Sequence, residues 1–223
     1  RLAGEATAGA ATWTGSNSQF FWTTNYRGTT DDIIHMYVTN FNPPDFLRYW
    51  NNAAQQWNFL KPAYDSMTPG NIIVTARVIV PFHNRLILLN TVEVTGAGNT
   101  TFLNRARWSQ LGSPVETSSF YDDVPGKGSY LDAPIQEQII TAEFLKDRLI
   151  VFFERSAWEF VYTGNDIAPF RWQQINTELG AESTFSIVPF DKVCIGIGNV
   201  GIHACNGSNV DRIDEKIPDL VFE

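Results

Sequence analysis

Three glycines near the end of the chain have the spacing of a dinucleotide-binding loop. Gly196, Gly198 and Gly201 fit the pattern Gly-x-Gly-x-x-Gly within VCIGIGNVGIHAC, residues 193–205. Such a loop binds pyrophosphate where a strand enters it, a helix leaves it, and an acid about 20 residues further on holds the ribose. Here the turn dipeptide Asn206-Gly207 and then Pro218 occupy the stretch where that helix and the next strand would run. We therefore expect a β-hairpin and no nucleotide cofactor.

The hairpin interpretation predicts a strand register. A turn at Asn199-Val200 pairs Cys194 with Cys205 across the two strands. A turn at Gly198-Asn199 is the alternative, and it shifts the register by two while keeping both cysteines on one face. The glycines, the cysteines and His203 then share one face, and the isoleucines share the other. Because neither face alternates with polar residues, we expect cover on both faces, and close cover on the glycine face. The cysteines are open to three interpretations: small buried residues, a cross-strand disulfide, or metal ligands.

The other polar residues form no catalytic or metal-binding pattern. His35, His83 and His203 lie in separate segments without the spacing of metal ligands. The acidic pairs Asp31-Asp32 and Asp122-Asp123 could bind a hard cation or act as glycosidase carboxylates, but adjacent acids in a strand point to opposite faces. The sequence thus predicts a protein that is not an enzyme, with no catalytic residues, metal or cofactor.

One strand-rich phrase recurs along the chain. FHNRLILLN at 82, LKDRLIVFF at 145 and FDKVCIGIG at 190 align without gaps, and YRGTTDDIIHMYVTN at 26 is a looser copy. Each copy places a short polar turn before a continuous apolar strand, with further strand-like stretches on either side. This repetition predicts an all-β fold, a β-propeller of about four visible blades or an arc of a larger one. The blade-like units lie near 18–60, 72–111, 135–177 and 183–217, with a surface excursion over 112–134.

Two segments also have helical features. DFLRYWNNAAQQWNFL, residues 45–60, places five apolar residues on one helical face after two prolines, so a helix is an alternative to strands there. QEQIITAEFLKDRL, residues 136–149, contains strong helix formers, and only the repeat alignment favours strand-turn-strand in its second half.

Composition limits the classes of partner. The chain has 223 residues, is 43% hydrophobic, and carries a net charge of −8 with a pI of about 4.9. A protein that grips nucleic acid needs an excess of lysine and arginine, whereas a pore lined with carboxylates would repel DNA and let it slide. No apolar run approaches the roughly 20 residues of a membrane-spanning helix. The start RLAGEATAG, without an initiator methionine or a signal segment, leads us to expect a processed chain or a fragment.

Several phrases, in this order, resemble a known family. They are NRLILLNT, NRARWSQLGSP, DRLIVFFERSAWEFVYTGNDIAPFRWQQINTELGAES and NGSNVDRIDEKI. Together they resemble the β-propeller proteins that form the nozzle or hub of bacteriophage tails, over residues 72–217 and more loosely over 20–60. The resemblance implies a virion structural protein of the tail, assembled in the bacterial cytoplasm as a homo-oligomeric ring. It also implies contacts with other tail or adaptor proteins and a channel through which viral DNA passes without sequence-specific binding.

The surface excursion supplies the candidate partner contacts. They are Phe120, Tyr121, Asp122, Asp123 and Tyr130, because exposed aromatic residues beside acids on a long loop are costly unless they are used. Two other functions stay open at this point. One is a carbohydrate-binding propeller whose tryptophans stack on sugar rings, and the other is a propeller glycoside hydrolase with a pair of carboxylates.

Overall fold

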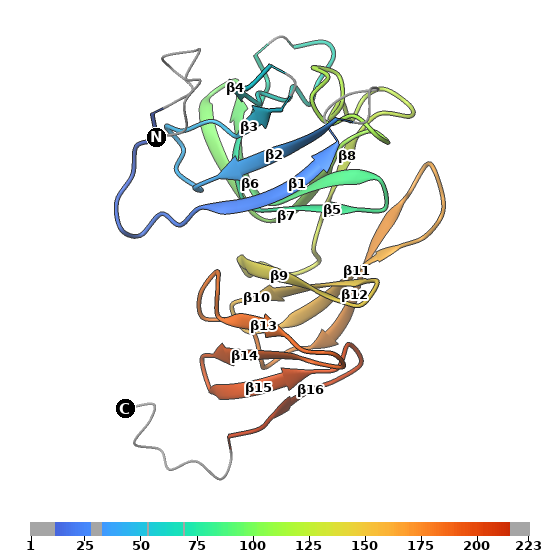
Figure 1. The fold of residues 1–223 in the computed structure, drawn as a ribbon. Helices are drawn as coiled ribbons and strands as arrows, with labels where there is room; N and C mark the ends of the chain where they lie inside the picture. Colours follow the sequence, from blue (N-terminus) through green and yellow to red (C-terminus); the bar gives the residue numbers. More distant parts are fainter. Residues whose placement is uncertain (1–11, 28–32, 53, 69, 215–223) are drawn as a thin grey trace. The chain divides into compact units, whose positions relative to one another are not determined.

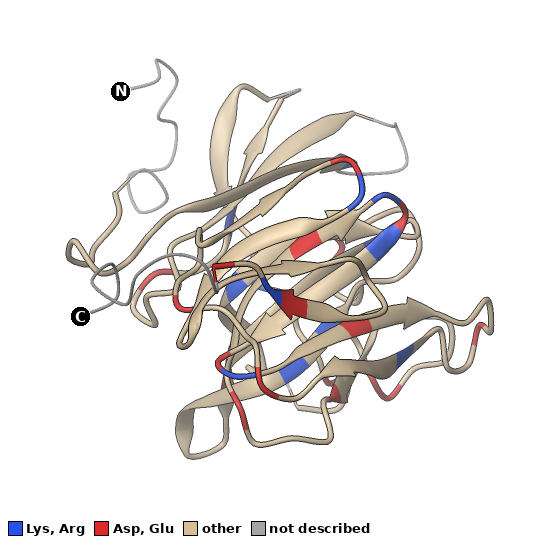
Figure 2. Cartoon of the chain, turned by 90° about the horizontal axis from the view of Figure 1, so that it is seen from below, with Lys and Arg blue, Asp and Glu red and all other residues tan. Residues whose placement is uncertain are grey.

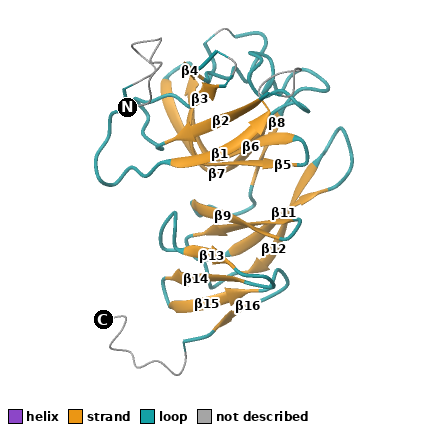
Figure 3. Ribbon diagram, viewed as in Figure 1, coloured by secondary structure: helices purple, strands orange, loops and turns teal. Residues whose placement is uncertain are grey.

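The computed structural model describes residues 12–27, 33–52, 54–68 and 70–214. All regular elements in these ranges are β-strands, as Figure 3 shows, so the prediction of an all-β fold is confirmed. The same ranges contain no helix that could cross a membrane. The chain divides into two compact units, Arg1–Asp132 and Ala133–Glu223, and each is described by itself.

The first unit contains two antiparallel sheets, and in each the strands follow one another in chain order (Figure 1). The first sheet consists of β1 (Trp22–Arg27), β2 (Ile34–Thr39), β3 (Arg48–Asn51) and β4 (Gln56–Phe59). The second sheet consists of β5 (Ile73–Phe82), β6 (Arg85–Thr95), β7 (Gly98–Trp108) and β8 (Ser129–Asp132).

The second unit repeats this arrangement with two further sheets in chain order. The third sheet consists of β9 (Ile139–Leu145), β10 (Arg148–Phe153), β11 (Ala157–Tyr162) and β12 (Phe170–Asn176). The fourth sheet consists of β13 (Ile187–Pro189), β14 (Cys194–Gly198), β15 (Gly201–Cys205) and β16 (Val210–Arg212).

The polar turns of the recurring phrase are tight hairpin turns. Phe82 pairs with Arg85, and the two residues between them have positive φ values of 45° and 57°, which suit the right-handed twist of the flanking strands. Leu145 pairs with Arg148 in the same way. The strand-turn-strand prediction for the second half of 136–149 is therefore confirmed.

The structure corrects the helical alternative over residues 45–60. This segment forms β3 and β4, joined by a tight turn in which Gln55 has a φ of 52°. Trp50 and Trp57, expected on one helical face, are instead cross-strand partners whose ring centroids lie 5.5 Å apart. Aromatic pairs of this kind stabilise antiparallel strands by about 0.2–1 kcal/mol, which favours the hairpin.

The expected excursion also contains regular structure. β8 falls within residues 112–134 and completes the second sheet by pairing with β7. The irregular connection between β7 and β8 is thus residues 109–128, and it returns to the edge of its own sheet.

Each unit has its own core between two sheets. In the first unit β5 contacts β1 and β2, and the shared core includes Tyr37, Leu47, Ile79, Leu86 and Leu88. In the second unit β13 contacts β9, and Ile150, Phe152, Ile187, Cys194 and Cys205 belong to one apolar cluster. We use "inner face" for the face of a sheet that looks toward its partner sheet within a unit, and "outer face" for the opposite one.

Candidate functional site: an ionic cluster under the excursion loop

The inner face of the second sheet changes character along its strands. Leu88 and Arg107 are cross-strand partners on β6 and β7, and alternate residues of a strand share a face. Beyond Leu88 the register of β6 against β7 shifts between Leu89 and Thr91. Glu93 then lies on the same face as Arg105 and Arg107, which donate hydrogen bonds to it, and Asp132 of β8 lies beside them. Figure 2 marks acidic and basic positions on the strands as well as in the loops.

Two bidentate ion pairs form the centre of this cluster. Arg107 donates from Nε and Nη2 to the two carboxylate oxygens of Glu93 at 2.7 and 2.9 Å. Arg105 donates to the two oxygens of Asp132 at 2.7 and 3.0 Å and to Glu93 at 3.1 Å. Arg107 also donates to Asp122 at 3.0 Å, and Thr91 donates its hydroxyl to Glu93 at 2.6 Å.

Burial makes the cluster electrostatically important. The side chains of Glu93 and Arg107 are each only 1% exposed, so each charge depends on the other for compensation. Burial disfavours the charged form of Arg105, but the hydrogen bonds to Asp132 and the charge of Glu93 outweigh it, so the pKa of Arg105 is raised. Burial, followed by the charge of Glu93, raises the pKa of Tyr64.

Aromatic rings cover both guanidinium groups. The Arg105 guanidinium carbon lies 3.6 Å from the ring centroid of Phe102 and 4.0 Å from that of Tyr130. The Arg107 carbon lies 4.4 Å from Tyr64 and 4.8 Å from Tyr130. These distances allow cation–π attraction, which strengthens as water is excluded.

The cluster is suited to a structural role. Each of its three acids, Glu93, Asp122 and Asp132, accepts a hydrogen bond from an arginine, so the carboxylates hold the two arginine side chains in place. The cluster joins β6, β7, β8 and the excursion loop at one place. Its effect is to fix the loop on the sheet.

The expectation that Phe120 is exposed is wrong. Its side chain is 0% exposed and belongs to the core of the first unit with Leu47, Leu86 and Leu88. The backbone at Gly128 can approach the backbone of Phe120 closely because Gly128 has no side chain. A Cβ at this position would lie 2.7 Å from the Cα of Phe120. Phe120 is therefore the apolar anchor of the excursion loop, which sequence reasoning placed on its surface.

Of the other four candidate contacts, Asp122 and Tyr130 belong to the ionic cluster, and Tyr121 and Asp123 are the chain neighbours of Asp122. The backbone N–H of Asp122 donates to the carbonyl of Tyr64 at 3.0 Å, and Asp123 accepts from the N–H of Ser66 at 3.1 Å. Both acids thus tie the excursion loop to residues 64–66. Tyr121 is half-buried, and Tyr130 is 41% exposed on β8. The structure brings Asp122 and Tyr130 together at Arg107, and the role of all four residues as partner contacts stays a prediction.

The Gly-x-Gly-x-x-Gly segment is the hairpin of β14 and β15. Cys194 pairs with Cys205 and Gly198 with Gly201, which is the register predicted for a turn at Asn199-Val200. A Cβ at Gly198 would lie 2.7 Å from the carbonyl oxygen of Gly180 and 3.0 Å from the His203 ring. The glycines therefore allow close packing on the inner face, as predicted. The outer face is not covered as expected, since Ile197 is 48% exposed.

Both cysteines are free and buried. Burial, followed by the neighbouring Cys205, raises the pKa of Cys194 to about 12, and burial also raises the pKa of Cys205. The structure thus contains two protonated thiols side by side. In the ranges that the structure describes, no three His, Cys, Asp or Glu side chains are grouped closely enough to hold a metal ion. Asp31-Asp32 lies outside the described residues.

Among the residues that the structure describes, each unit includes a small pocket. The first has a volume of about 190 Å³ and lies between β3, β4 and the excursion loop, lined by Tyr49, Phe59, Leu60, Lys61, Pro62, Val115, Glu116 and Thr117. The second has a volume of about 310 Å³ and is lined by Ile140, Glu154, Arg155, Ala181, Glu182 and Asn199. Pockets for drug-sized ligands usually measure about 300–1,000 Å³, so the first is below that range and the second at its lower limit.

Sequence reasoning missed Glu93, Arg105 and Arg107. The available signal was the pair Arg105-x-Arg107 at the end of a strand, because residues two apart share a face and both would then face the core. Two arginines on a buried face require acids nearby.

Comparisons with known proteins add little to this picture. No family model and no curated protein matches the chain. Among solved structures, the chain is similar to the extracellular domain of a proposed one-component system from B. thetaiotaomicron, with 8% sequence identity and a TM-score of 0.31. The match covers 85% of this chain and 33% of that one, so the chain spans about a third of its length. The likeness is too weak to identify a shared fold.

Proposed function

We propose that this chain is a virion structural protein, a subunit of the nozzle or hub of a bacteriophage tail, with its four sheets as blades of a β-propeller. The observation that carries the proposal is the repetition of one unit: four antiparallel sheets, each of four strands in chain order. That is the topology of propeller blades. In this proposal several copies form a ring with a central channel for viral DNA and bind other tail proteins.

Two further features support a role in assembly. The buried acid of the ionic cluster, Glu93, is held by two arginines, which suits a rigid scaffold. The net charge of −8 would repel a DNA backbone in a channel. Neither feature depends on the resemblance of the sequence phrases to the tail proteins.

The test is the native mass of the chain by size-exclusion chromatography with light scattering, followed by negative-stain images of the peak. The proposal expects a ring with a central opening, and no retention of duplex DNA in a filter-binding assay at low salt. A protein that stays monomeric, or a ring that binds DNA tightly, would contradict it.

One observation favours a second candidate, a carbohydrate-binding module. Trp50 and Trp57 are both half-buried, so part of each indole is accessible for stacking on the apolar face of a pyranose. Titration with a panel of oligosaccharides while tryptophan fluorescence is followed would test this candidate. A fluorescence change that is lost in Trp57→Ala and kept in Trp172→Ala would support it.

A further inference from the structure

The two cysteines of the chain lie opposite each other in the fourth sheet. Cys194 and Cys205 are cross-strand partners on β14 and β15, and both belong to the apolar cluster of the second unit. Their row continues to Pro189 on β13 and Val210 on β16, so it crosses all four strands of the sheet. Within one copy of the chain, each thiol therefore has a single possible disulfide partner.

The cysteine pair occupies a hydrogen-bonded position of the strand ladder. The N–H of Ile197 donates to the carbonyl of Ser186, which precedes β13, so the backbone groups of Ile197 point away from β15. Backbone groups of successive residues in a strand point to alternate sides, so those of Cys194, three residues earlier, point toward Cys205. Residues of such a pair exchange both backbone hydrogen bonds, and their Cα atoms lie about 5.5 Å apart.

A disulfide fits this position with some strain. Cα atoms about 4.4–6.8 Å apart allow a disulfide, so the two Cα atoms need not move. The Cβ atoms of opposed residues lie about 4.5–5.5 Å apart, with hydrogen-bonded pairs at the wide end, whereas a disulfide needs about 3.5–4.5 Å. The Cβ atoms must therefore approach each other by roughly 1 Å. Strain of this kind makes a disulfide easier to reduce.

The hairpin has features of a segment that opens locally, which gives the buried thiols access to a reagent. The strands that flank it, β13 and β16, have three residues each, and Ile197 and Val200 on the hairpin itself are 48% and 44% exposed. Few buried contacts and exposed backbone hydrogen bonds are typical of such segments. Burial raises the pKa of both thiols in the closed sheet, so we expect exchange to be slow and to occur during openings.

We propose that Cys194 and Cys205 are a reversible redox pair, which forms a cross-strand disulfide by exchange with a small disulfide such as oxidised glutathione. One cysteine thiolate attacks oxidised glutathione, which gives a mixed disulfide and releases one glutathione thiolate. The other cysteine thiolate then attacks the protein sulfur of the mixed disulfide and releases the second glutathione thiolate. Two electrons pass from the protein to glutathione, and the two thiol protons end on the released thiolates.

The disulfide would hold the two middle strands of the fourth sheet together. It closes a covalent ring through residues 194–205, so β14 and β15 can no longer separate at this row. Reducing compartments keep the thiols free, and oxidising ones close the bridge. This inference is independent of the proposed ring, because both cysteines belong to one copy of the chain.

The experiment measures the redox state of the folded full chain in glutathione buffers. Samples that start reduced and samples that start oxidised are held until they agree, and free thiols are then labelled with iodoacetamide in urea and counted by mass spectrometry. We expect an intramolecular disulfide in oxidised glutathione, and two labelled thiols in about a hundredfold excess of reduced glutathione.

Other results would overturn the proposal. Thiols that stay free in oxidised glutathione would show that the strands cannot accommodate the bridge. Chains that end as mixed disulfides or as linked dimers would show that the two cysteines do not react with each other. A disulfide that excess reduced glutathione leaves intact would be a structural bridge and not a reversible pair.

A matched control moves the cysteine pair to another position of the same hairpin. Ile197 and Ile202 are cross-strand partners in a non-hydrogen-bonded position, where Cα atoms lie about 4.5 Å apart and side chains are closer. The variant combines Ile197→Cys and Ile202→Cys with Cys194→Ala and Cys205→Ala, and urea unfolding verifies its fold. Because the bridge of this variant needs less movement, glutathione should reduce the native pair at least about tenfold more readily at equilibrium. An equal or smaller value for the native pair would overturn the proposal.

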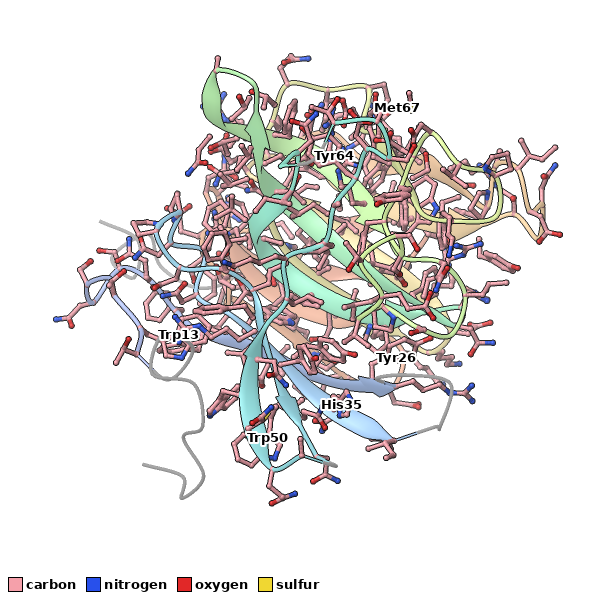
Figure 4. The ribbon with its side chains drawn as sticks, turned by 90° about the horizontal axis from the view of Figure 1, so that it is seen from above. Trp13, Tyr26, His35, Trp50, Tyr64 and Met67 are labelled. Atoms are coloured by element: carbon pink, nitrogen blue, oxygen red, sulfur yellow. The ribbon has the colours of Figure 1, made fainter. Side chains whose placement is uncertain are left out.

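Met67 is an internal control for nonspecific oxidation. Its side chain, labelled in Figure 4, is 83% exposed in the first unit. Thiol–disulfide exchange leaves a thioether unchanged, whereas stronger oxidants convert methionine to its sulfoxide. Bridged chains with unmodified Met67 would support exchange with glutathione. A bridge found only in chains with Met67 sulfoxide would result from general oxidation and would overturn the proposal.

Discussion

The two units differ in how deeply their ion pairs are buried. In the first unit the inner face of the second sheet buries two arginines against Glu93, and aromatic rings cover them. In the second unit the inner face of the fourth sheet carries glycines, two thiols and His203, and the arginines of the pairs Arg148–Glu159 and Arg212–Asp214 stay about a third exposed, at 32% and 39%. The comparison teaches that one sheet topology tolerates either buried arginines or arginines that keep contact with water, provided that each has an acid beside it.

The largest effect is expected from removing the central acid of the first unit. Glu93→Gln leaves Arg105 and Arg107 buried with less negative charge, and breaking a buried ion pair costs about 3–5 kcal/mol of unfolding free energy. Urea unfolding measures the loss. The matched control is Glu116→Gln, because Glu116 is 45% exposed and lies 3.7 Å from Lys127, so its loss should cost at most about 1 kcal/mol. Equal losses for both variants would refute the special role of the cluster.

The next effect tests close packing in the second unit. Gly198→Ala brings a methyl group against the carbonyl oxygen of Gly180 and the ring of His203, and overpacking of this kind typically costs about 1–3 kcal/mol. Gly96→Ala is the control, since nothing lies within 4 Å of a Cβ there. Thermal unfolding of both variants compares them. If Gly198→Ala proved as mild as Gly96→Ala, the inner face of the fourth sheet would be more loosely packed than described.

A smaller effect is a pH dependence of the unfolding free energy that comes from His203 of the second unit. Burial lowers the pKa of His203 from its ordinary value of 6.5, and this outweighs the opposing effects of Gly201 and Asp214. Above pH 6.5 the imidazole is neutral in both the folded and unfolded states, so it contributes no pH dependence. Below pH 6.5 the unfolded state gains the proton first, and stability falls by up to about 1.4 kcal/mol per pH unit until the folded pKa is reached.

The measurement is the free energy of unfolding between pH 7 and pH 5, in wild type and in His203→Phe. The variant should have a shallower slope below pH 6.5. His83→Phe serves as the control because His83 lies exposed in the β5–β6 turn. A slope that His203→Phe leaves unchanged would assign the pH dependence to other groups.

The smallest effect is one on reactivity. The raised pKa values of Cys194 and Cys205 keep both thiols protonated at pH 8, and the thiolate is the reactive form. Iodoacetamide should therefore label neither cysteine in the folded protein and both after unfolding in urea, as mass spectrometry would show. Rapid labelling under native conditions would mean that the fourth sheet opens easily.

The strands could be predicted where local sequence was sufficient. In the β14–β15 hairpin a turn between two apolar runs limits the register to two choices, and the structure has the one with Asn199-Val200 at the turn and Cys194 paired with Cys205. At residues 45–60 the same apolar residues fit a helix and a hairpin, and the choice depended on pairing between Trp50 and Trp57 and on the tertiary context.

The candidate site could be predicted only in part. Asp122 and Tyr130 were singled out as residues of a loop, but their partners Arg105 and Arg107 lie on a strand, and no local pattern links the two segments. Phe120 was misplaced because an aromatic residue in a polar loop can anchor that loop in a core or protrude from it. The difference lies in long-range packing, here the approach of Gly128.

The chain order of the strands has a consequence for biosynthesis. Each sheet is one uninterrupted stretch of polypeptide, as in the third sheet from Ile139 to Asn176, so none has to wait for a distant strand before its ladder is complete. A ribosome adds about 5–20 residues per second, whereas a β-hairpin forms in about 1–10 μs. Each hairpin can therefore close as soon as its second strand emerges from the ribosome.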